Sequence, residues 1–432
     1  MVWPKVAQTF VSKISLFKIL LLAFIVRVIL LPLIYHGDVT TIYWWGKFAS
    51  EFTWRGYYDW LNFGGYNHPD QPMLLIDYSF IIRQTYLFFY QILWFLNTHI
   101  PLFPSNFMTW YFLNGNQFLI KFPFVLTDIT LIYLVYKFLH NKFAAILLAL
   151  YLPLIYNSAV WGSGDSLINL LGLLSIYFLF QKKYLYFTLF FFSSVMFKPS
   201  LIIWSPLILI IFFKNRLNLK NIFTMLAIIL FLIYLISRPF AITNPFVWFF
   251  GLMTQKILPG VMPQITSNAM NFWALFYGLV PKLDETIIFN LISVRGLSLI
   301  ISAFLYLYIS IRLYRHYSLK NLILALVQIS LVTFTFMTRM HERYTFPALI
   351  PLFILCFYNQ RFIKYFIILT LTHLFNVYHW WWFPQINFLI SFLSLEPVIR
   401  LISLTNVILT ISLLIDTKLI FPLKLPTTTK LK

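Results

Sequence analysis

Apolar runs of about twenty residues recur along almost the whole chain, and they constrain its fold more than any other feature. A run of this length crosses the hydrocarbon core of a bilayer as an α-helix, which satisfies its backbone hydrogen bonds internally. The composition agrees, because 61% of the 432 residues are hydrophobic and only 10% are charged. The period-2 alternation of a membrane β-barrel is absent. The sequence therefore predicts an all-α, polytopic helical membrane protein.

Hydropathy and length predict about twelve transmembrane helices. They lie at about residues 17–35, 117–138, 143–160, 166–181, 184–198, 200–213, 221–238, 290–313, 321–337, 345–358, 362–380 and 398–415. No Gly/Ser-rich linker or soluble stretch separates them, so we expect one membrane domain over residues 1–432. Lys5, Lys13 and Lys18 precede the first run without a small-residue cleavage site, so that run is expected to be a retained span.

The basic residues stand in short clusters between the apolar runs and not on one continuous face. The net charge of +20 therefore indicates topology under the positive-inside rule and not nucleic-acid binding. With both termini in the cytoplasm, 19 of the 32 basic residues and only Asp416 of the 12 acids fall on the cytoplasmic side. Asp128 lies inside a span, and the opposite face takes ten acids: Asp38, Glu51, Asp59, Asp70, Asp77, Asp165, Asp284, Glu285, Glu342 and Glu396.

This charge pattern has a consequence for residues 73–116, which are apolar enough for a span. One crossing there would invert every later loop, so the stretch is predicted to begin and end on the outer side. Interfacial helices or a re-entrant hairpin would achieve this. Residues 36–116 then form a first large outer-face loop region, and residues 239–289 form a second. The single cysteine, Cys356, excludes a disulfide framework and a Cys-based metal site.

Polar clusters stand at or just beyond the predicted outer ends of the spans. Ionisable groups in such positions line a cavity or a pathway by default, so we expect the clusters to converge on one outer-face site. The clusters are His36-Gly37-Asp38, Tyr66 to Asp70, Asn157 to Asp165 with Trp161, Phe197-Lys198-Pro199, Asn268 to Trp273 with Asn271, and Arg339 to Pro347.

Six stretches carry a resemblance to the GT-C superfamily of polytopic glycosyltransferases. They are Gly37-Asp38, Lys121-Phe122-Pro123 to Asp128, Asn157 to Asp165, Lys198-Pro199, Asn268 to Trp273, and Met340-His341-Glu342-Arg343-Tyr344. The chain most resembles prokaryotic members related to the second mannosyltransferase of glycosylphosphatidylinositol synthesis. It resembles the dolichyl-phosphate-glucose-dependent glucosyltransferases of N-glycan assembly more loosely.

The resemblance implies a GT-C-like fold and a single-displacement transfer with inversion at the anomeric carbon. The donor would be a polyprenyl-phosphate sugar, mannose or another hexose, and the acceptor a glycan, a glycolipid, a lipid or a protein. The lipid-linked donor is a substrate, so no cofactor or metal is expected. The protein would lie in the cell membrane, with its active site on the outer face.

Such a transfer needs a base for the acceptor hydroxyl, and Asp38 is our candidate. A carboxylate held close to a neutral hydroxyl suits this task, and His36 is near enough in sequence to tune it. The alternative is a structural one, in which Asp38 caps the helix that follows and accepts backbone N–H groups. Asp165 is a second candidate base, or it orients substrate or caps the span that begins beside it.

The departing phosphate needs cations or other donors. Arg343 is the candidate because a guanidinium binds phosphate with two parallel hydrogen bonds, and His341 and Arg339 stand beside it. The alternative is that Glu342 and Arg343 pair with other loop charges and only fix the loop. Lys198 is a further candidate cation, or a lysine that reaches to the interface from a span end.

The remaining candidates are supporting ones. Trp161, Asn268 and Asn271 belong to the predicted substrate-binding set. Asp128 must find a partner inside its span, and an ion pair with Arg27 of the first span is expected. The His36/Asp38 and His68/Asp70 spacings match no established metal site.

A polytopic transporter or lipid flippase is the alternative function. Transporters usually show duplicated halves with paired broken helices and a site near the bilayer midplane. No such duplication is visible in this sequence, and its polar residues gather at one face.

Overall fold

The computed structural model describes residues 11, 13–33, 36–51, 73–241, 244–257, 262–288 and 290–416. Within them the chain is 78% helical, with eighteen α-helices and almost no strand. The expectation of an all-α protein is therefore correct. The predicted polar stretch from Tyr66 to Asp70 and the basic residues Lys5 and Lys418 to Lys432 lie outside the described ranges.

Each of the twelve predicted spans contains a helix, but their number as membrane crossings is not confirmed. Among the described residues, five helices are long and apolar enough to cross a membrane, or six if one bent pair counts as a single span. The five are Ser105–Leu139, Leu219–Ser237, Val294–Arg315, Leu319–Phe336 and Glu396–Ile415, and the bent pair is Lys142–Ala149 with Leu152–Trp161. Three shorter apolar helices, Asp165–Phe180, Tyr184–Phe197 and Phe346–Tyr358, have 16, 14 and 13 residues. At 1.5 Å per residue these reach about 20–24 Å, less than the roughly 30 Å hydrocarbon core.

The chain divides into two compact units, and each is built from separate segments. An N-terminal unit contains the chain up to Leu201 together with Leu219–Val261. A C-terminal unit contains Ile202–Asn218 and the chain from Met262 onward. The units are described one at a time below, and the single membrane domain stays a prediction.

The N-terminal unit is helical throughout its described part. Its elements are α2 (Leu16–Leu30), α3 (Gly37–Glu51), α5 (Met73–His99), α6 (Ser105–Leu139), α7 (Lys142–Ala149), α8 (Leu152–Ile155), the π-helix η1 (Tyr156–Trp161), α9 (Asp165–Phe180), α10 (Tyr184–Phe197), the 3-10 helix η2 (Pro199–Trp204) that leads out of the unit, α12 (Leu219–Ser237), α13 (Pro245–Leu252) and the π-helix η3 (Met253–Ile257).

The C-terminal unit packs its helices around α16. Its elements are α11 (Ser205–Asn215), α14 (Ala274–Tyr277), strands β1 (Ile287–Ile288) and β2 (Ile292–Ser293), α15 (Val294–Arg315), α16 (Leu319–Phe336), α17 (Phe346–Tyr358), α18 (Phe362–Trp380), α19 (Asn387–Leu393) and α20 (Glu396–Ile415). Every residue from Asn321 to Phe336 is buried, because α11, α15, α17 and α20 pack against α16. The two strands form one short antiparallel pair.

Several helices begin where the sequence supplies a capping side chain. The Ser15 hydroxyl accepts the backbone N–H of Lys18 at 3.3 Å, and Asn141 Oδ1 accepts the N–H groups of Phe143 and Ala144 at 2.8 and 3.2 Å. Asn244, Ser293 and Ser318 act in the same way at later helices. These residues satisfy N–H groups that the first helical turn leaves without partners.

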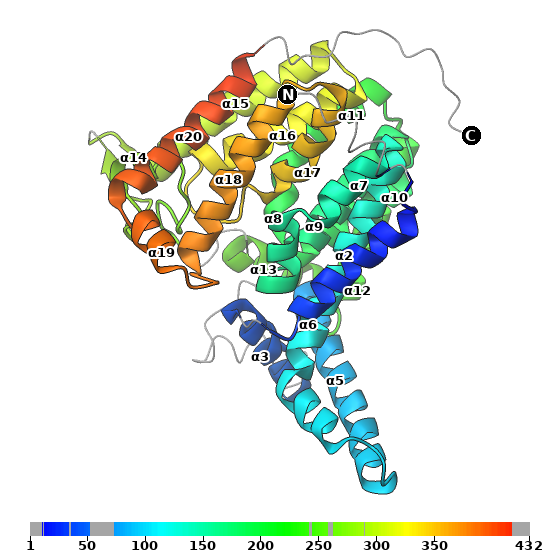
Figure 1. The fold of residues 1–432 in the computed structure, drawn as a ribbon. Coiled ribbons are helices and arrows are strands. Elements are labelled where there is room, and N and C mark those ends of the chain that lie inside the picture. Colours follow the sequence, from blue (N-terminus) through cyan, green and yellow to red (C-terminus); the bar gives the residue numbers. More distant parts are fainter. Residues whose placement is uncertain are drawn as a thin grey trace. The chain divides into compact units, whose positions relative to one another are not determined.

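Residues 73–116, which were predicted to lie on the outer side, form a helical hairpin made of α5 and the first part of α6. Helix α5 and the first part of α6 lie side by side, joined by a turn over residues 100–104 (Figure 1). Helix α5 is not among the candidate spans. The structure thus gives the stretch a hairpin form, and the side of the membrane on which it lies stays a prediction.

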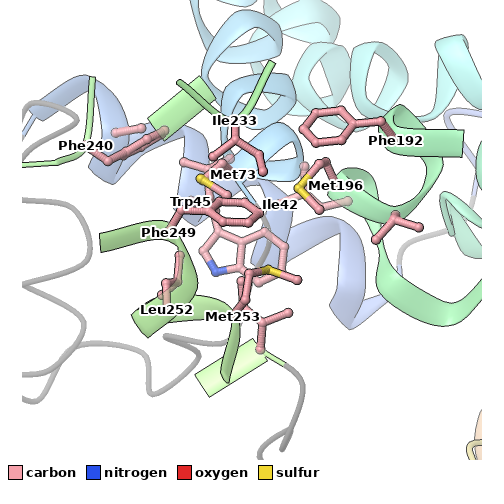
Figure 2. Close-up of a cluster of buried hydrophobic side chains, with 14 of the residues drawn as sticks. Ile42, Trp45, Met73, Phe192, Met196, Ile233, Phe240, Phe249, Leu252 and Met253 are labelled. Atoms are coloured by element: carbon pink, nitrogen blue, oxygen red, sulfur yellow. The ribbon is translucent and has the colours of Figure 1, made fainter. Parts of the chain in front are cut away.

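A large apolar cluster joins α3 to the rest of the N-terminal unit. Val39, Ile42, Trp45 and Ala49 of α3 are buried in it, against residues from α5, α10, α12 and α13 (Figure 2). Gly46 lies in the same helix where a Cβ atom would stand 2.3 Å from the carbonyl oxygen of Ser79, so only glycine allows this approach to α5. The cluster fixes α3 and therefore the position of its first turn.

Candidate functional site

Helix α3 begins directly at the polar cluster that the sequence singles out. His36 precedes the helix, and its Nδ1 accepts the backbone N–H of Asp38 at 3.0 Å. His36 therefore caps the helix, and its Nδ1 carries no proton in this arrangement because it is the acceptor. Asp38 stands in the first turn, where the helix dipole favours a negative charge.

The Asp38 carboxylate is held by a residue from far along the chain. Trp161 Nε1 donates a hydrogen bond of 2.8 Å to Asp38 Oδ2. The His36 ring lies over the Trp161 ring with the centroids 4.0 Å apart, and His36 Nδ1 is 3.5 Å from Asp38 Oδ1. Trp161 and His36 are buried, whereas 38% of the Asp38 side chain is exposed. The structure thus brings three predicted site residues together and leaves the carboxylate accessible.

Trp161 reaches Asp38 because the chain around it departs from a regular helix. It ends the π-helix η1, and π-helical turns recur at functional sites. Gly162 follows with φ of +80°, and a Cβ atom there would stand 2.6 Å from Val39 Cγ2 and 3.1 Å from Lys121 Cγ. Only glycine allows this turn in such close contact with α3 and α6.

The same turn positions a second carboxylate. Lys198 Nζ lies 2.7 Å from Asp165 Oδ1, and the Ser163 hydroxyl donates to Asp165 Oδ2 at 2.8 Å. The Asp165 side chain is 8% exposed and that of Lys198 is 23% exposed. Asp165 begins α9 and Lys198 follows α10, so the antiparallel packing of these two helices creates the ion pair. Asp165 and Lys198 were both predicted, but not as partners.

A third polar group lies deeper in the N-terminal unit. Arg27 Nε is 2.8 Å from Asp128 Oδ2, and both side chains are completely buried. The Ser158 hydroxyl also donates to Asp128, and Arg27 Nη1 donates to the backbone oxygens of Ala23 and Ala149. The predicted ion pair between the first span and Asp128 is therefore confirmed. Lys121, which lies two turns before Asp128 on the same face of α6, is buried and donates to the Leu31 carbonyl at 3.3 Å.

In the C-terminal unit, Arg339 forms a bidentate ion pair with Asp284. Its Nε and Nη2 lie 2.7 and 3.1 Å from the two carboxylate oxygens, and the Thr338 hydroxyl donates to the same carboxylate at 3.0 Å. Asp284 is completely buried. Arg339 also has a left-handed backbone, with φ of 63°. This geometry corresponds to the alternative for the cluster, in which its charges fix the loop.

Glu342 is the centre of the remaining charges in that unit. Its side chain is only 2% exposed, with Arg343 Nη1 at 3.1 Å from Oε1 and His341 Nδ1 at 3.8 Å from Oε2. The Asn376 side chain donates to the Glu342 backbone oxygen at 2.7 Å. Arg343 keeps 19% of its side chain exposed.

The two predicted asparagines have different surroundings. Asn268 has a left-handed backbone, φ of 63°, and its backbone pairs with that of His341. Asn271 is completely buried, and its Nδ2 donates to the carbonyls of Phe334 and Met337 at the end of α16. Its Oδ1 accepts the N–H groups of Trp273 and Ala274. Asn271 therefore ties a loop to α16, and its predicted substrate contact stays a prediction.

Some polar partners were not singled out from the sequence. Ser163 holds Asp165, and Asp284 was counted only as an outer acid. Asn376 was missed, although a polar amide inside the apolar run 362–380 is itself a signal for a buried contact. His36, Asp38, Trp161, Asp165 and Lys198 belong to the N-terminal unit; Asn268, Asn271, Arg339, His341, Glu342 and Arg343 belong to the C-terminal unit.

Three or more His, Cys, Asp or Glu side chains arranged to hold a metal ion are not found within the described ranges. Comparison of the sequence with protein-family models gives no match, and a search of curated proteins gives none either.

Proposed function

We propose that this chain is a membrane glycosyltransferase that moves a hexose from a polyprenyl-phosphate donor to an acceptor hydroxyl. Asp38 is the general base, and the acceptor is a glycan, a lipid or a protein on the outer face of the cell membrane. The proposed architecture is GT-C-like with about twelve spans and cytoplasmic termini. The observation that carries the proposal is the Asp38 carboxylate, which is held at 2.8 Å by Trp161 and still reaches solvent.

The reaction is a single displacement. Asp38 accepts the proton of the acceptor hydroxyl while the acceptor oxygen forms a bond to the anomeric carbon of the donor. The bond between that carbon and the phosphate oxygen breaks, and its electron pair leaves with the phosphate. The products are the inverted glycoside and a polyprenyl phosphate with one more negative charge, and the proton passes from Asp38 to water.

Asp38 is favoured over Asp165 because of what each carboxylate touches. The Lys198 ammonium lies 2.7 Å from Asp165. An adjacent cation stabilises the charged carboxylate and makes it a weaker base. Asp38 is held by the neutral indole of Trp161, which orients the carboxylate without adding a full positive charge. Asp38 is also the more exposed of the two, at 38% against 8%.

Lys198 is the cation we assign to the departing phosphate. It lies in the same unit as Asp38 and keeps 23% of its side chain exposed. The phosphate contact predicted for Arg343 concerns the C-terminal unit and stays a prediction.

The test is transfer from a defined donor. Membranes of cells that lack the chromosomal gene and carry wild-type or variant chains receive polyprenyl-phosphate mannose with a radiolabelled sugar, and the glucose analogue in parallel. We expect wild-type chains to move label into a lipid, glycan or protein fraction. Asp38→Asn is expected to lower that transfer by about 10²–10⁴-fold, the usual contribution of a general base.

Glu51→Gln is the matched control, because Glu51 lies at the other end of α3, pairs with Lys47 at 3.9 Å and is 48% exposed. It is expected to transfer normally. If Asp38→Asn transfers normally and Asp165→Asn does not, the base is Asp165. If wild-type membranes transfer neither sugar above membranes without the chain, the proposed function is wrong.

A further inference from the structure

We propose that a small cavity in the C-terminal unit binds the phosphate group of an anionic lipid. The cavity lies where α15 ends and α16 begins, and it is here called the Arg312 cavity. The side chains that carry the argument are Arg312, His316, Asn321, Ala325 and Gln328, all of which line it. The inference does not depend on the proposed glycosyl transfer, because every lining residue belongs to the C-terminal unit.

The first argument is a buried donor group on a charged side chain. Arg312 Nη1 donates to the Leu414 carbonyl at the end of α20. Arg312 Nη2 is also buried, but it finds no hydrogen-bond partner among the residues that the structure describes. A buried N–H group of a cation is costly to leave without an acceptor. The position therefore favours a bound oxygen atom, and a negatively charged one most.

The second argument is the chemistry of the cavity wall. Asn321 Nδ2 donates to the His316 carbonyl and Gln328 Nε2 to the Leu413 carbonyl, each at 2.7 Å, so both amides are held in place. No carboxylate is among the described side chains that line the cavity. A wall that contains a guanidinium and an imidazole but no acid suits an anion and not a metal ion.

The size of the cavity limits what can enter it. Its volume is about 10 Å³, which is room for one water-sized atom. One oxygen of a phosphate group has this size, so it can enter beside the Arg312 guanidinium while the rest of the headgroup stays outside. A water molecule would also fit and would accept a hydrogen bond from Nη2, but it would not neutralise the charge of the guanidinium.

The third argument is the charge around the cavity. Lys214 Nζ, at the end of α11, lies 3.8 Å from the centroid of the Tyr314 ring on α15, and Lys320 Nζ, on α16, lies 4.5 Å from that of Tyr358 at the end of α17. The ends of α11, α15 and α17 therefore meet near the start of α16. Among the described residues, these helix ends and the turns beside them carry seven basic side chains and, after α20, one acid: Lys214, Arg216, Arg312, Arg315, Lys320, Arg361 and Lys364, with Asp416. Basic pockets between membrane helices bind anionic headgroups.

The helices beside the cavity favour a lipid over a soluble anion. Both α15 and α20 are candidate membrane spans, and both pack against α16. Large apolar side chains are exposed along them, among them Phe304 and Leu307 on α15 and Ile408 and Ile415 on α20. Lipid tails that lie against such faces bring their headgroups to the helix ends. The positive-inside rule predicts that this basic end faces the cytoplasm, where membrane lipids are anionic.

Thermal unfolding of the purified full chain in detergent tests the proposal. The Tm is measured with added phosphatidylglycerol, with phosphatidylcholine of the same acyl chains, or with inorganic phosphate at the same concentration. A ligand that binds the folded state raises the Tm, so phosphatidylglycerol should raise it several-fold more than either of the others. An equal rise with phosphatidylcholine would overturn the proposal. A rise with inorganic phosphate that matches phosphatidylglycerol would identify a soluble anion as the occupant and overturn the lipid assignment.

Two substitutions locate the binding. Arg312→Gln should lower the Tm rise from phosphatidylglycerol several-fold. Arg315→Gln is the matched control, because it removes the same charge from an exposed side chain three residues later that does not line the cavity. The control should keep the rise, and an equal loss in both variants would mean attraction to the whole basic end and overturn the cavity. If Arg312→Gln fails to fold, Ala325→Val fills the cavity and keeps every charge; it should also lose the rise, and a rise at the wild-type level would overturn the proposal.

Discussion

The acids of the described chain differ in what neutralises them, and this difference separates structural carboxylates from the candidate base. Asp128 is paired with Arg27, Asp165 with Lys198 and Asp284 with Arg339, each with an N···O distance of 2.7 or 2.8 Å. Each of these carboxylates has a cation as its partner, and the pair joins segments that are far apart in the sequence. Asp38 accepts a hydrogen bond from the neutral indole of Trp161, and 38% of its side chain is exposed.

Trp161→Phe tests the indole contact, because it keeps an aromatic ring against His36 and removes the donor to Asp38. A hydrogen bond to a charged group contributes about 1.5–3 kcal/mol. If it acts on the reacting state, transfer should fall by about 10–100-fold at 1.4 kcal/mol per factor of ten. The measurement is transfer from polyprenyl-phosphate mannose per amount of folded protein.

The control for that substitution is Trp204→Phe. Trp204 is also buried, and its Nε1 donates to the Ser330 hydroxyl at 3.1 Å in the C-terminal unit. The Trp204→Phe substitution should lower thermal stability but should leave the transfer per folded chain unchanged. Equal loss of transfer in both variants would contradict a specific role for the Trp161 donor.

The Asp77 carboxyl leads to a prediction of how protein stability depends on pH. Burial raises the pKa of the Asp77 carboxyl from its ordinary value of 3.8 to about 6, and neither a hydrogen bond nor an ion pair reaches it from the residues that the structure describes. A raised folded-state pKa contributes stability below pH 4 that is lost as the pH rises through 6. Asp77→Asn should therefore stabilise the protein at pH 7.5 by about 1–3 kcal/mol, less where water screens the partly buried group.

Thermal unfolding of the purified wild type and Asp77→Asn across pH 4.5–7.5 checks this. The difference in Tm should be largest and nearly constant near pH 7.5, and it should narrow as the pH falls through 6 toward 4.5. A difference that stays constant across this range would mean that the titration of Asp77 does not affect folding.

At the level of single residues, the sequence predicted a contact correctly where charge and burial left few possible partners. Arg27 and Asp128 are opposite charges inside apolar runs, and leaving either alone in a membrane is costly, so the pair could be expected. The bond between Trp161 and Asp38 could not be expected, since it joins residues 123 positions apart and depends on a π-helical turn. Asp165 and Lys198 were each chosen, but their pairing depends on how α9 and α10 pack.

At the scale of elements, the buried ion pair joins α2 to α6. Removing one partner leaves the other charge buried without compensation, which costs about 3–5 kcal/mol. Asp128→Asn should therefore lower the yield and Tm of the folded protein strongly. The double variant Arg27→Met with Asp128→Leu should recover most of the loss, because an apolar pair of similar volume often replaces a buried ion pair.

Thermal unfolding in detergent, followed by size-exclusion chromatography, measures this for the two single variants and the double variant. If the double variant is as unstable as Asp128→Asn, the contribution is not an ion pair between the helices. Transfer per folded chain should stay unchanged in the double variant, since the pair does not reach Asp38.

Helix positions could be predicted from apolar runs, but their ends and breaks could not. The predicted span 143–160 is divided into α7 and the segment of α8 and η1, bent by 49°. Pro153 stands in the first turn after the break, where its missing N–H costs nothing. The predicted span 200–213 begins with the 3-10 helix η2. Such breaks depend on tertiary packing, which an apolar run in the sequence does not encode.

At the scale of the whole molecule, the membrane orientation predicted from the charges can be followed on one helix pair, α9 and α10. Helix α9 begins at Asp165, α10 ends beside Lys198, and the turn between them carries Lys182 and Lys183. The ion pair between Asp165 and Lys198 therefore lies at the opposite end of this helix pair from the basic turn. If the positive-inside rule applies, the basic turn faces the cytoplasm, and the end that carries Asp165 faces outward.

Labelling of single cysteines in intact cells tests this orientation. In a Cys356→Ala background, Lys183→Cys and Lys320→Cys should react with an impermeant maleimide only after the membrane is opened. Leu291→Cys lies in the C-terminal unit, a few residues after Asp284 and Glu285 in the sequence, and it should react in intact cells. The reason is the cost of moving Lys and Arg clusters across the membrane during insertion, which keeps them on the cytoplasmic side. Reaction of Lys183→Cys in intact cells would show that the N-terminal unit has the opposite orientation in the membrane. Asp38 would then face the cytoplasm, where the proposed outer-face transfer could not occur.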